Sequence, residues 1–294
     1  MDKEIRLLNE TDYPRLMSMD TGLGDDYVLQ IFKRLVTENN NRLYGLFLES
    51  QLISVGGYTI FANQYAMLGR LRSDRRFRGN NVATTLMSYM ANEAFKQNGI
   101  QWVGANTQED NVPARRVLKK LGFPELTTLH GALSEDPSSF VSGTPVKPWH
   151  KLGNLERKKE LINKYYIKNS AIFPYECYYP FPASMALFPE KLLEEWSFYE
   201  NDKRTRFLIM RKDRKKHYYL HVIYPWTDMT EQAGLWETIS IEYEEFAMEN
   251  MEDQTYIWMD LTKVEALSLP ENHPFILPSP WILHGMYKTD WKKR

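Results

Sequence analysis

Short stretches of alternating or β-branched apolar residues are separated, along the first 133 residues, by segments whose apolar positions recur every three to four residues. The first kind of stretch predicts β-strands at 5–8, 43–48, 52–60, 65–73, 102–106 and 126–132. The second kind predicts helices that begin after Asn9, after Asp26, at Val82 and at Asn111. The order of strand, two helices, three strands, helix, strand, helix and strand predicts an α+β domain with a mixed sheet.

The pattern changes beyond residue 133. Residues 134–150 are rich in turn-forming residues and lack periodicity, so they predict a linker. The remaining chain is rich in aromatic residues and predicts helices at 155–166, 190–196 and 238–248 and strands at 207–211, 218–224, 256–260 and 281–287. We therefore expect a first domain over 1–133, a linker over 134–150 and a second, smaller α+β domain over 151–294. The second domain has no phosphate-binding turn of its own, and two roles stay open: a degenerate copy of the first domain, or a cover over an acceptor-binding cleft.

Composition adds limits on the partners and the compartment. The chain has 294 residues, 43% hydrophobic and 26% charged, with a net charge of -1. This balance gives no overall attraction to polyanions, so nucleic acid is not the expected partner. No apolar run approaches the roughly 20 residues of a membrane span, and Met1-Asp2-Lys3-Glu4 lacks the layout of a signal peptide. We expect a cytoplasmic protein with no membrane partner.

Neither a disulfide nor a metal site is expected. Cys177 is the single cysteine, which excludes an internal disulfide and a CxxC pair. His217 and His221 lie on one face of a predicted strand, but they lack carboxylate or cysteine neighbours at the spacing of metal ligands.

The segment 71–86 predicts a strand that runs through an arginine-rich turn directly into a helix. The first backbone N–H groups of a helix lack intrahelical partners and carry a partial positive charge, so they favour an anion such as phosphate. The sequence Arg78-Gly79-Asn80-Asn81-Val82-Ala83 resembles the acyl-CoA pyrophosphate loop of the GCN5-related N-acetyltransferases (GNAT), whose usual form is (Gln/Arg)-x-x-Gly-x-(Gly/Ala). Asn81 replaces the central glycine, and asparagine is the least costly replacement where a positive φ is needed.

A second segment resembles the same family. Residues 111–123, Asn-Val-Pro-Ala-Arg-Arg-Val-Leu-Lys-Lys-Leu-Gly-Phe, are similar to its Asn-x-x-Ala-x-x-hydrophobic-Tyr-x-x-x-Gly-Phe signature, in the same order and at a fitting distance from the first motif. An ordinary capped amphipathic helix would also use Asn111 and Gly122. The two motifs together extend the resemblance over about residues 5–132.

The resemblance implies a GNAT-type α+β fold, a mixed and splayed sheet with flanking helices, and acetyl-CoA as co-substrate. Asn111 would then contact the pantetheine arm, and Ala114 would let that arm pass close to the helix. Backbone N–H groups near Leu71 to Ser73 would polarise the thioester carbonyl. The implied cofactor-binding residues are Leu71, Arg72, Ser73, Arg76, Arg78, Gly79, Asn80, Asn81, Val82, Ala83, Thr84, Asn111 and Ala114.

The catalytic residues depart from the family pattern. Leu118 stands where many members have the tyrosine that protonates the departing thiolate, and Arg70 and Arg72 stand where a catalytic glutamate is often found. Candidate bases are Glu109, Asp74 and His130. Each also has a structural interpretation: Glu109 as a solvated loop charge, Asp74 as the partner of Arg75 or Arg78, and His130 as a half-buried strand residue.

Three functions remain open at this point. The first is an N-acyltransferase that moves acetyl from acetyl-CoA to a primary amine of a small molecule or peptide, by direct attack in a ternary complex. The second is a CoA-binding regulatory module without catalysis, which Leu118 favours. The third is RNA binding through the arginines of 70–78, although a cofactor with several phosphates needs such charges by itself. Arg70 or Arg72 has a further possible role, which is to bind an acidic group of the acceptor.

Overall fold

The computed structural model describes residues 3–77, 79–143 and 145–293 and divides the chain into two compact units. Unit 1 comprises Met1–Leu126 and Ile282–Arg294, and unit 2 comprises Thr127–Trp281. Residues 282–294, which the sequence pattern places in the second domain, therefore pack with the first. No helix within the described ranges is long and apolar enough to cross a membrane.

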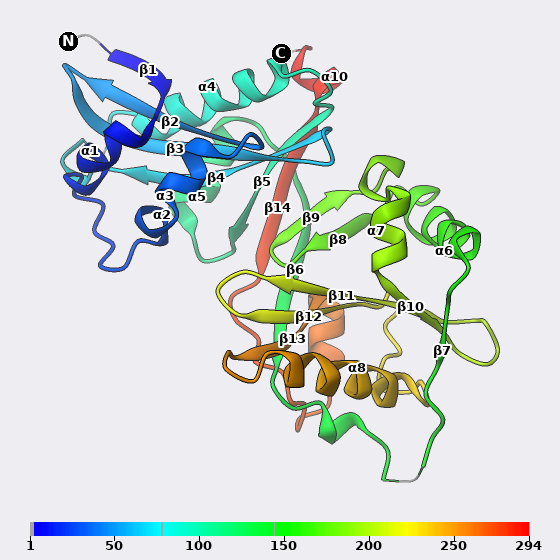
Figure 1. Ribbon diagram of the computed structural model, residues 1–294. Helices are drawn as coiled ribbons and strands as arrows, with labels where there is room; N and C mark the ends of the chain where they lie inside the picture. Colours follow the sequence, from blue (N-terminus) through cyan, green and yellow to red (C-terminus); the bar gives the residue numbers. More distant parts are fainter. Residues whose placement is uncertain (1–2, 78, 144, 294) are drawn as a thin grey trace. The chain divides into compact units, whose positions relative to one another are not determined.

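Unit 1 is built on strands in the spatial order β1-β2-β3-β4-β5-β14 (Figure 1). Their bounds are β1 Lys3–Leu7, β2 Asn41–Leu48, β3 Gln51–Phe61, β4 Tyr65–Ser73, β5 Trp102–Gln108 and β14 Trp281–Tyr287. Strands β1 to β4 pair antiparallel, whereas β5 pairs parallel with β4. The parallel pair requires a crossover, and the helix α4 supplies it.

The helices of unit 1 cover both faces of its strands. They are α1 Tyr13–Met17, α2 Tyr27–Gln30, α3 Phe32–Thr37, α4 Val82–Lys96, α5 Val112–Lys120 and α10 Lys288–Trp291. Alternate residues of β2 face opposite sides: Leu43 packs with α1, α2 and α3, while Tyr44 packs with α4 and α5. The single helix predicted from Tyr27 is divided at Ile31, whose backbone is not helical.

The indole of Trp102 fixes the place of the last strand. Trp102 is fully buried on β5, and its ring lies against the backbones of Gly104 and Gly285. A β-carbon at Gly285 would lie 1.9 Å from Cζ2 of Trp102. Glycine is therefore required on β14 where the large ring crosses it.

Unit 2 contains strands in the order β6-β13-β12-β11-β10-β7 and a separate pair, β8 and β9. Their bounds are β6 Glu125–Ser134, β7 His150–Lys151, β8 Ile172–Glu176, β9 Tyr179–Pro182, β10 Ser197–Glu200, β11 Phe207–Arg214, β12 Tyr218–Ile223 and β13 Thr255–Thr262. Strand β6 begins just before the boundary between the units. Strand β11 extends to Arg214, beyond the end predicted at residue 211, so the turn before β12 is shorter than the sequence pattern suggests.

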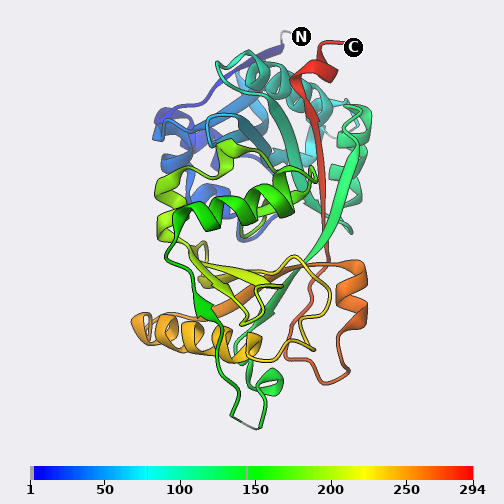
Figure 2. The same ribbon diagram turned by 90° about the vertical axis from the view of Figure 1, so that its right-hand side faces the viewer.

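Helices lie on both faces of the unit 2 strands, with α8 along one face and α6 on the other (Figures 1 and 2). The helices are α6 Leu155–Ile162, continued by a π-helical turn Asn163–Ile167, α7 Glu190–Glu195, α8 Leu235–Glu249 and α9 Lys263–Ser268. The predicted linker is partly ordered against this unit: Phe140 stacks on Trp236 with 4.4 Å between ring centroids.

The two units share one topology. In each, four antiparallel strands are followed by a crossover helix and a strand parallel to the fourth: β12, α8 and β13 in unit 2 correspond to β4, α4 and β5 in unit 1. Both crossover helices have 15 residues and begin after a residue with left-handed backbone, Asn81 or Gly234. This parallel supports the proposal that the second domain is a degenerate copy of the first.

Candidate functional site

The strands β4 and β5 separate at their carboxyl ends. Their parallel pairing joins Tyr65–Leu68 to Trp102–Ala105, yet β4 continues to Ser73 and β5 to Gln108. The register of β4 with β3 also shifts between Val55 and Gly57. This divergence is the splay that the family resemblance implies, and the two strands are no longer paired on the side from which α4 begins.

The turn between β4 and α4 is shaped to present backbone N–H groups. Gly79 and Asn81 have φ values of 88° and 54°, so both adopt the left-handed region, as the asparagine in place of glycine requires. The Asn81 side chain does not cap α4 but accepts a hydrogen bond from Lys120 Nζ at 2.8 Å. The first turn of α4 thus has the geometry of an anion site, with Val82 in the core and Ala83 and Thr84 partly exposed.

The arginines of this junction are held by carboxylates. Arg72 binds Asp26 through two hydrogen bonds of 2.7 and 2.8 Å, and Arg75 binds Asp20 at 2.7 Å. These acidic residues lie in the α1–α2 segment, whose partnership with β4 has no local signal in the sequence. Arg78, the remaining arginine of the motif, lies outside the described residues. The positive charges of these arginines are therefore already paired with carboxylates of the protein itself.

Asp74 is the anchor of the turn. Its side chain is fully buried and accepts two hydrogen bonds from the Arg76 guanidinium, at 2.8 and 2.5 Å, and two from the backbone N–H groups of Arg76 and Asp20. The Arg76 guanidinium is the main reason that the pKa of the Asp74 carboxyl is lowered to about 2. A carboxylate with so low a pKa is a weak base, and Asp74 has a structural role as an arginine partner. The partner is Arg76, however, and Arg75, one of the two predicted partners, binds Asp20 instead.

Asp74 should make the fold sensitive to acid. Because its pKa is about 2 in the folded chain and 3.8 for an unperturbed aspartate, its stabilisation is complete above about pH 4 and is lost as the pH falls toward about 2. The shift corresponds to about 2 kcal/mol. Asp74→Asn should lower the free energy of unfolding in urea at neutral pH, and its difference from wild type should shrink between about pH 4 and pH 2. The exposed Asp20→Asn is the control, and a pH-independent difference for Asp74→Asn would contradict this role.

The second motif, residues 111–123, contains the helix α5 and the residue that caps it. The Asn111 side chain caps α5 by accepting the N–H of Ala114 at 3.2 Å, and Ala114 is partly exposed. Leu118 is buried in the core of unit 1 together with Phe123. The departure at Leu118 therefore places an apolar side chain, and no proton donor, at this position.

The remaining candidate bases lie in different units. Glu109 follows β5 in unit 1, and its carbonyl accepts a hydrogen bond from Arg115 at 3.0 Å. His130 lies on β6 in unit 2, opposite Leu261, and its Nδ1 atom is buried without a hydrogen-bond partner in the described structure. Lys120, which approaches the turn through Asn81, was not among the residues that the motifs suggest. The sequence feature that could have indicated Lys120 is its position in the last turn of α5.

The corresponding turn of unit 2 is closed. The pairing of β12 with β13 extends over Tyr218–Val222, almost to the end of β12 at Ile223. At the start of α8, a β-carbon on Gly234 would lie 2.4 Å from the carbonyl oxygen of Lys147. The Trp149 indole also covers this end and donates to the Ala233 carbonyl at 2.9 Å. Unit 2 thus lacks both the splay and the open helix start of unit 1.

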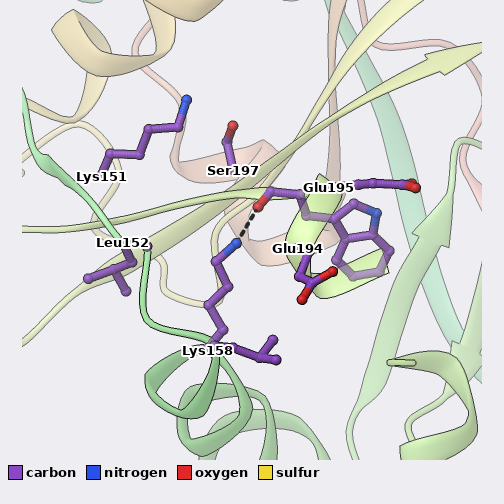
Figure 3. Close-up of a pocket in the computed structure, with 9 residues that line it drawn as sticks. Lys151, Leu152, Lys158, Glu194, Glu195 and Ser197 are labelled. Atoms are coloured by element: carbon purple, nitrogen blue, oxygen red, sulfur yellow. Dashed lines mark hydrogen bonds between the residues drawn. The ribbon is translucent and has the colours of Figure 1, made fainter. Parts of the chain in front are cut away.

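Unit 2 contains a pocket of about 360 Å³ beside Lys158, a buried side chain of α6. Figure 3 shows Lys158 extending toward the segment that carries Glu194, Glu195 and Ser197. Its Nζ donates to the carbonyl oxygens of Leu193 at 2.6 Å and Trp196 at 2.8 Å, which completes the end of α7. Burial, with a contribution from Lys151, lowers the pKa of Lys158. The hydrogen bonds give this lysine a structural role.

In the described part of the chain, no three His, Cys, Asp or Glu side chains are grouped so that they could hold a metal ion. The single cysteine, Cys177, is buried, and this burial raises the pKa of its thiol well above the usual range. The thiol is therefore protonated at neutral pH and unsuited to nucleophilic attack.

Comparison with known proteins supports the same view of the fold. The family model described as "Acetyltransferase (GNAT) family" matches residues 6–123. A search of curated proteins finds no match to the chain. A GCN5-related N-acetyltransferase from Sphaerobacter thermophilus has a similar structure, with 12% identity, a TM-score of 0.56, and coverage of 97% of this chain and 96% of that one.

Two further solved structures are similar over most of the chain. A proposed acetyltransferase from Pyrococcus horikoshii has 10% identity and a TM-score of 0.53, and covers 97% of this chain and 89% of its own. One from Thermoplasma acidophilum has 15% identity and a TM-score of 0.50, with coverage of 94% and 89%. The predicted fold class, a GNAT-type mixed sheet followed by a second α+β region, is confirmed.

Proposed function

Residues 6–123 of this chain match the model of the GNAT acetyltransferase family, and on that basis we propose that the protein is an N-acyltransferase. It would transfer acetyl from acetyl-CoA to a primary amine of a small molecule or peptide. The observation that carries the proposal is the open turn of Gly79 and Asn81 at the start of α4, beside the divergence of β4 and β5. An elongated cofactor with a pyrophosphate at one end fits this pair of features.

In this proposal the cofactor is held mainly by backbone groups. The N–H groups from Asn80 to Thr84 would bind the pyrophosphate at the start of α4, and Lys120 would add positive charge next to it. The pantetheine arm would run between β4 and the first turn of α5, near Asn111 and Ala114. Arg72 and Arg76 would act indirectly, because their bonds to Asp26 and Asp74 fix the turn.

The chemistry would proceed by direct attack. The lone pair of the neutral amine forms a bond to the thioester carbonyl carbon, and N–H groups near Leu71 to Ser73 stabilise the resulting oxyanion. Collapse of this intermediate breaks the C–S bond, and the thiolate leaves with the electron pair. Leu118 cannot protonate the thiolate, so solvent would do so. Removal of the amine proton would fall to Glu109, the candidate base of unit 1, because the low pKa of Asp74 makes it a weak base.

The proposal predicts one acetyl-CoA site per chain. Since the helix start in unit 2 is covered by Lys147 and Trp149, only unit 1 should bind the cofactor. Calorimetric titration of the full chain should give one site, and acetyl-CoA at 100 times its Kd should stabilise the fold by about 2.7 kcal/mol, seen as a rise in Tm. Pantetheine is the control, because it carries no phosphate group for the turn to bind. No change in Tm at millimolar acetyl-CoA would contradict the proposal.

A second candidate function is a CoA-binding regulatory module, which the apolar, buried Leu118 favours. The two functions differ in turnover. Release of free CoA, followed with a thiol reagent over a panel of primary amines, should exceed the rate of spontaneous hydrolysis if the protein is an acyltransferase. Binding at one site without amine-dependent release would favour the regulatory module.

A further inference from the structure

Arg70 differs from the other described arginines of the β4–α4 junction. Arg72, Arg75 and Arg76 each form an ion pair with an aspartate. Arg70 is partly buried, and its contacts within the described residues include no carboxylate; its guanidinium donates one hydrogen bond, from Nη2 to the Thr59 hydroxyl at 2.7 Å. The charge of the Arg70 guanidinium is therefore not neutralised by an acidic side chain and is free to attract an anionic ligand.

The guanidinium is held in place by neutral groups. The Thr59 hydroxyl donates its own proton to Asn41 Oδ1 at 2.6 Å, so its oxygen is left to accept from Arg70. A guanidinium has five N–H donors in a rigid, planar fork, and one bond leaves donors that match the two oxygens of a carboxylate. Asn41 and Thr59 thus orient Arg70 without neutralising it.

The backbone at Arg70 is strained. Its φ of 59° is in the left-handed region, which an arginine rarely adopts, and strained residues of this kind gather at functional sites. It follows closely on the last paired residues of the splay, Leu68 and Ala105. Next to it, a β-carbon added at Gly69 would have nothing within 4 Å, so the strand is open at this point.

The position of Arg70 separates it from the phosphate turn. Its partner Thr59 bonds to Asn41, which shares a strand face with Leu43. Leu43 packs with α1, α2 and α3, whereas α4 covers the opposite face. We propose that Arg70 binds an acidic group of the amine acceptor and so selects acceptors that carry a carboxylate near the amine. This inference rests on the proposed acyltransferase function. The carboxylate could belong to a free amino acid or to an acidic side chain at the N-terminus of a peptide.

The test compares acid and amide forms of the same acceptors. One arm uses free amino acids against their α-amides, and the other uses C-terminally amidated peptides that begin with Glu against the same peptides that begin with Gln. The wild type should have a KM about 10- to 100-fold lower for the acid form in one arm, the range expected for a charge-assisted hydrogen-bonded pair. The arm that shows the preference identifies the source of the carboxylate.

Variants of Arg70 connect the preference to this side chain. Arg70→Asn keeps a residue that tolerates positive φ but removes the charge, so it should fold with an unchanged Tm and lose the preference. Its KM for acetyl-CoA should stay at the wild-type value. Arg70→Lys keeps the charge and should retain part of the preference. Gly69→Leu, which fills the open space, should raise the KM for acceptors and leave cofactor binding intact.

The possible results distinguish a failure of the role proposed for Arg70 from a failure of the proposed acyltransferase function. Equal use of acid and amide forms by the wild type would overturn the role of Arg70 while leaving the acyltransferase intact. A preference that survives in Arg70→Asn would also overturn it. If acetyl-CoA binds but no acceptor in either arm is acetylated, both the inference and catalysis fail and the regulatory module remains. If acetyl-CoA does not bind, the proposed function itself fails.

Discussion

Replacement of Thr84 by glutamate is expected to abolish acetyl-CoA binding and to leave the free protein as stable as the wild type. Thr84 lies in the first turn of α4, where the Asn81 side chain does not cap the helix. A negative charge in the first turn of a helix is favourable, by about 0.3–1 kcal/mol, because it interacts with the helix dipole. The same charge would occupy the place of the pyrophosphate and repel it.

The repulsion is large enough to eliminate binding. Two unit charges about 4 Å apart near a protein surface interact with about 4 kcal/mol, and each 1.4 kcal/mol changes Kd about tenfold. The Kd for acetyl-CoA should therefore rise at least about a hundredfold. Calorimetric titration gives the Kd, and the increase in Tm with acetyl-CoA should disappear. Damage to the fold would not remove binding while leaving stability at the wild-type value.

Two controls locate the effect. Thr84→Gln has nearly the shape of glutamate without its charge and should bind acetyl-CoA within a few-fold of wild type. Thr85→Glu carries the same charge on the next residue, which is exposed and whose N–H already donates to the Asn81 carbonyl at 2.8 Å. Its effect should be clearly weaker. Unchanged binding by Thr84→Glu would show that the cofactor phosphates lie elsewhere.

The elements that bear on the site could be predicted because their signals are local. Alternation of apolar residues located β4, helical spacing located α4, and a glycine with a following asparagine indicated the left-handed turn. The roles of the arginines could not be predicted in the same way. The resemblance implies that Arg72 is a cofactor-binding residue, but the structure pairs it with Asp26, which lies at a helix start distant in the sequence. An ion pair between residues that are distant in the sequence cannot be recognised from a local sequence pattern.

In unit 2, prediction of strands from the sequence is limited for a similar reason. The segments that form β8 and β9 contain Pro174 and Pro180, which normally argue against a strand because proline lacks an N–H donor. The two prolines lie opposite each other in a two-stranded ribbon, where each strand has a free edge. The tertiary arrangement therefore tolerates them, and aromatic contacts such as the T-shaped pair of Phe173 and Phe188 stabilise the segment.

Gly285→Ala tests a long-range connection in the fold, the return of β14 to unit 1. The added methyl carbon would lie 1.9 Å from Cζ2 of Trp102, and this buried ring has Gly104 close to its other atoms. Neither group can move without displacing the strand, so we expect a loss of about 3 kcal/mol or more in the free energy of unfolding. In a unit of this size the loss corresponds to a fall of about 10 °C in Tm. Urea unfolding followed by circular dichroism measures it.

A double-mutant cycle assigns the loss to the contact between the two strands. Trp102→Leu alone should destabilise the protein through the cavity that it leaves, but it makes room for the methyl group of Gly285→Ala. The double variant should therefore be more stable than the sum of the two single changes predicts, by at least about 1 kcal/mol. Gly69→Ala is the matched control, since its β-carbon would meet nothing within 4 Å, and it should change stability little.

Additive effects of Trp102→Leu and Gly285→Ala would mean that β14 does not pack on β5. If the coupling is observed, any truncation that removes the second half of the chain also removes a strand from unit 1, which we propose binds the cofactor. Loss of acetyl-CoA binding in such a fragment would then reflect damage to unit 1 and give no information about unit 2. The role of unit 2 must be tested in the full chain, with substitutions that leave residues 282–294 in place.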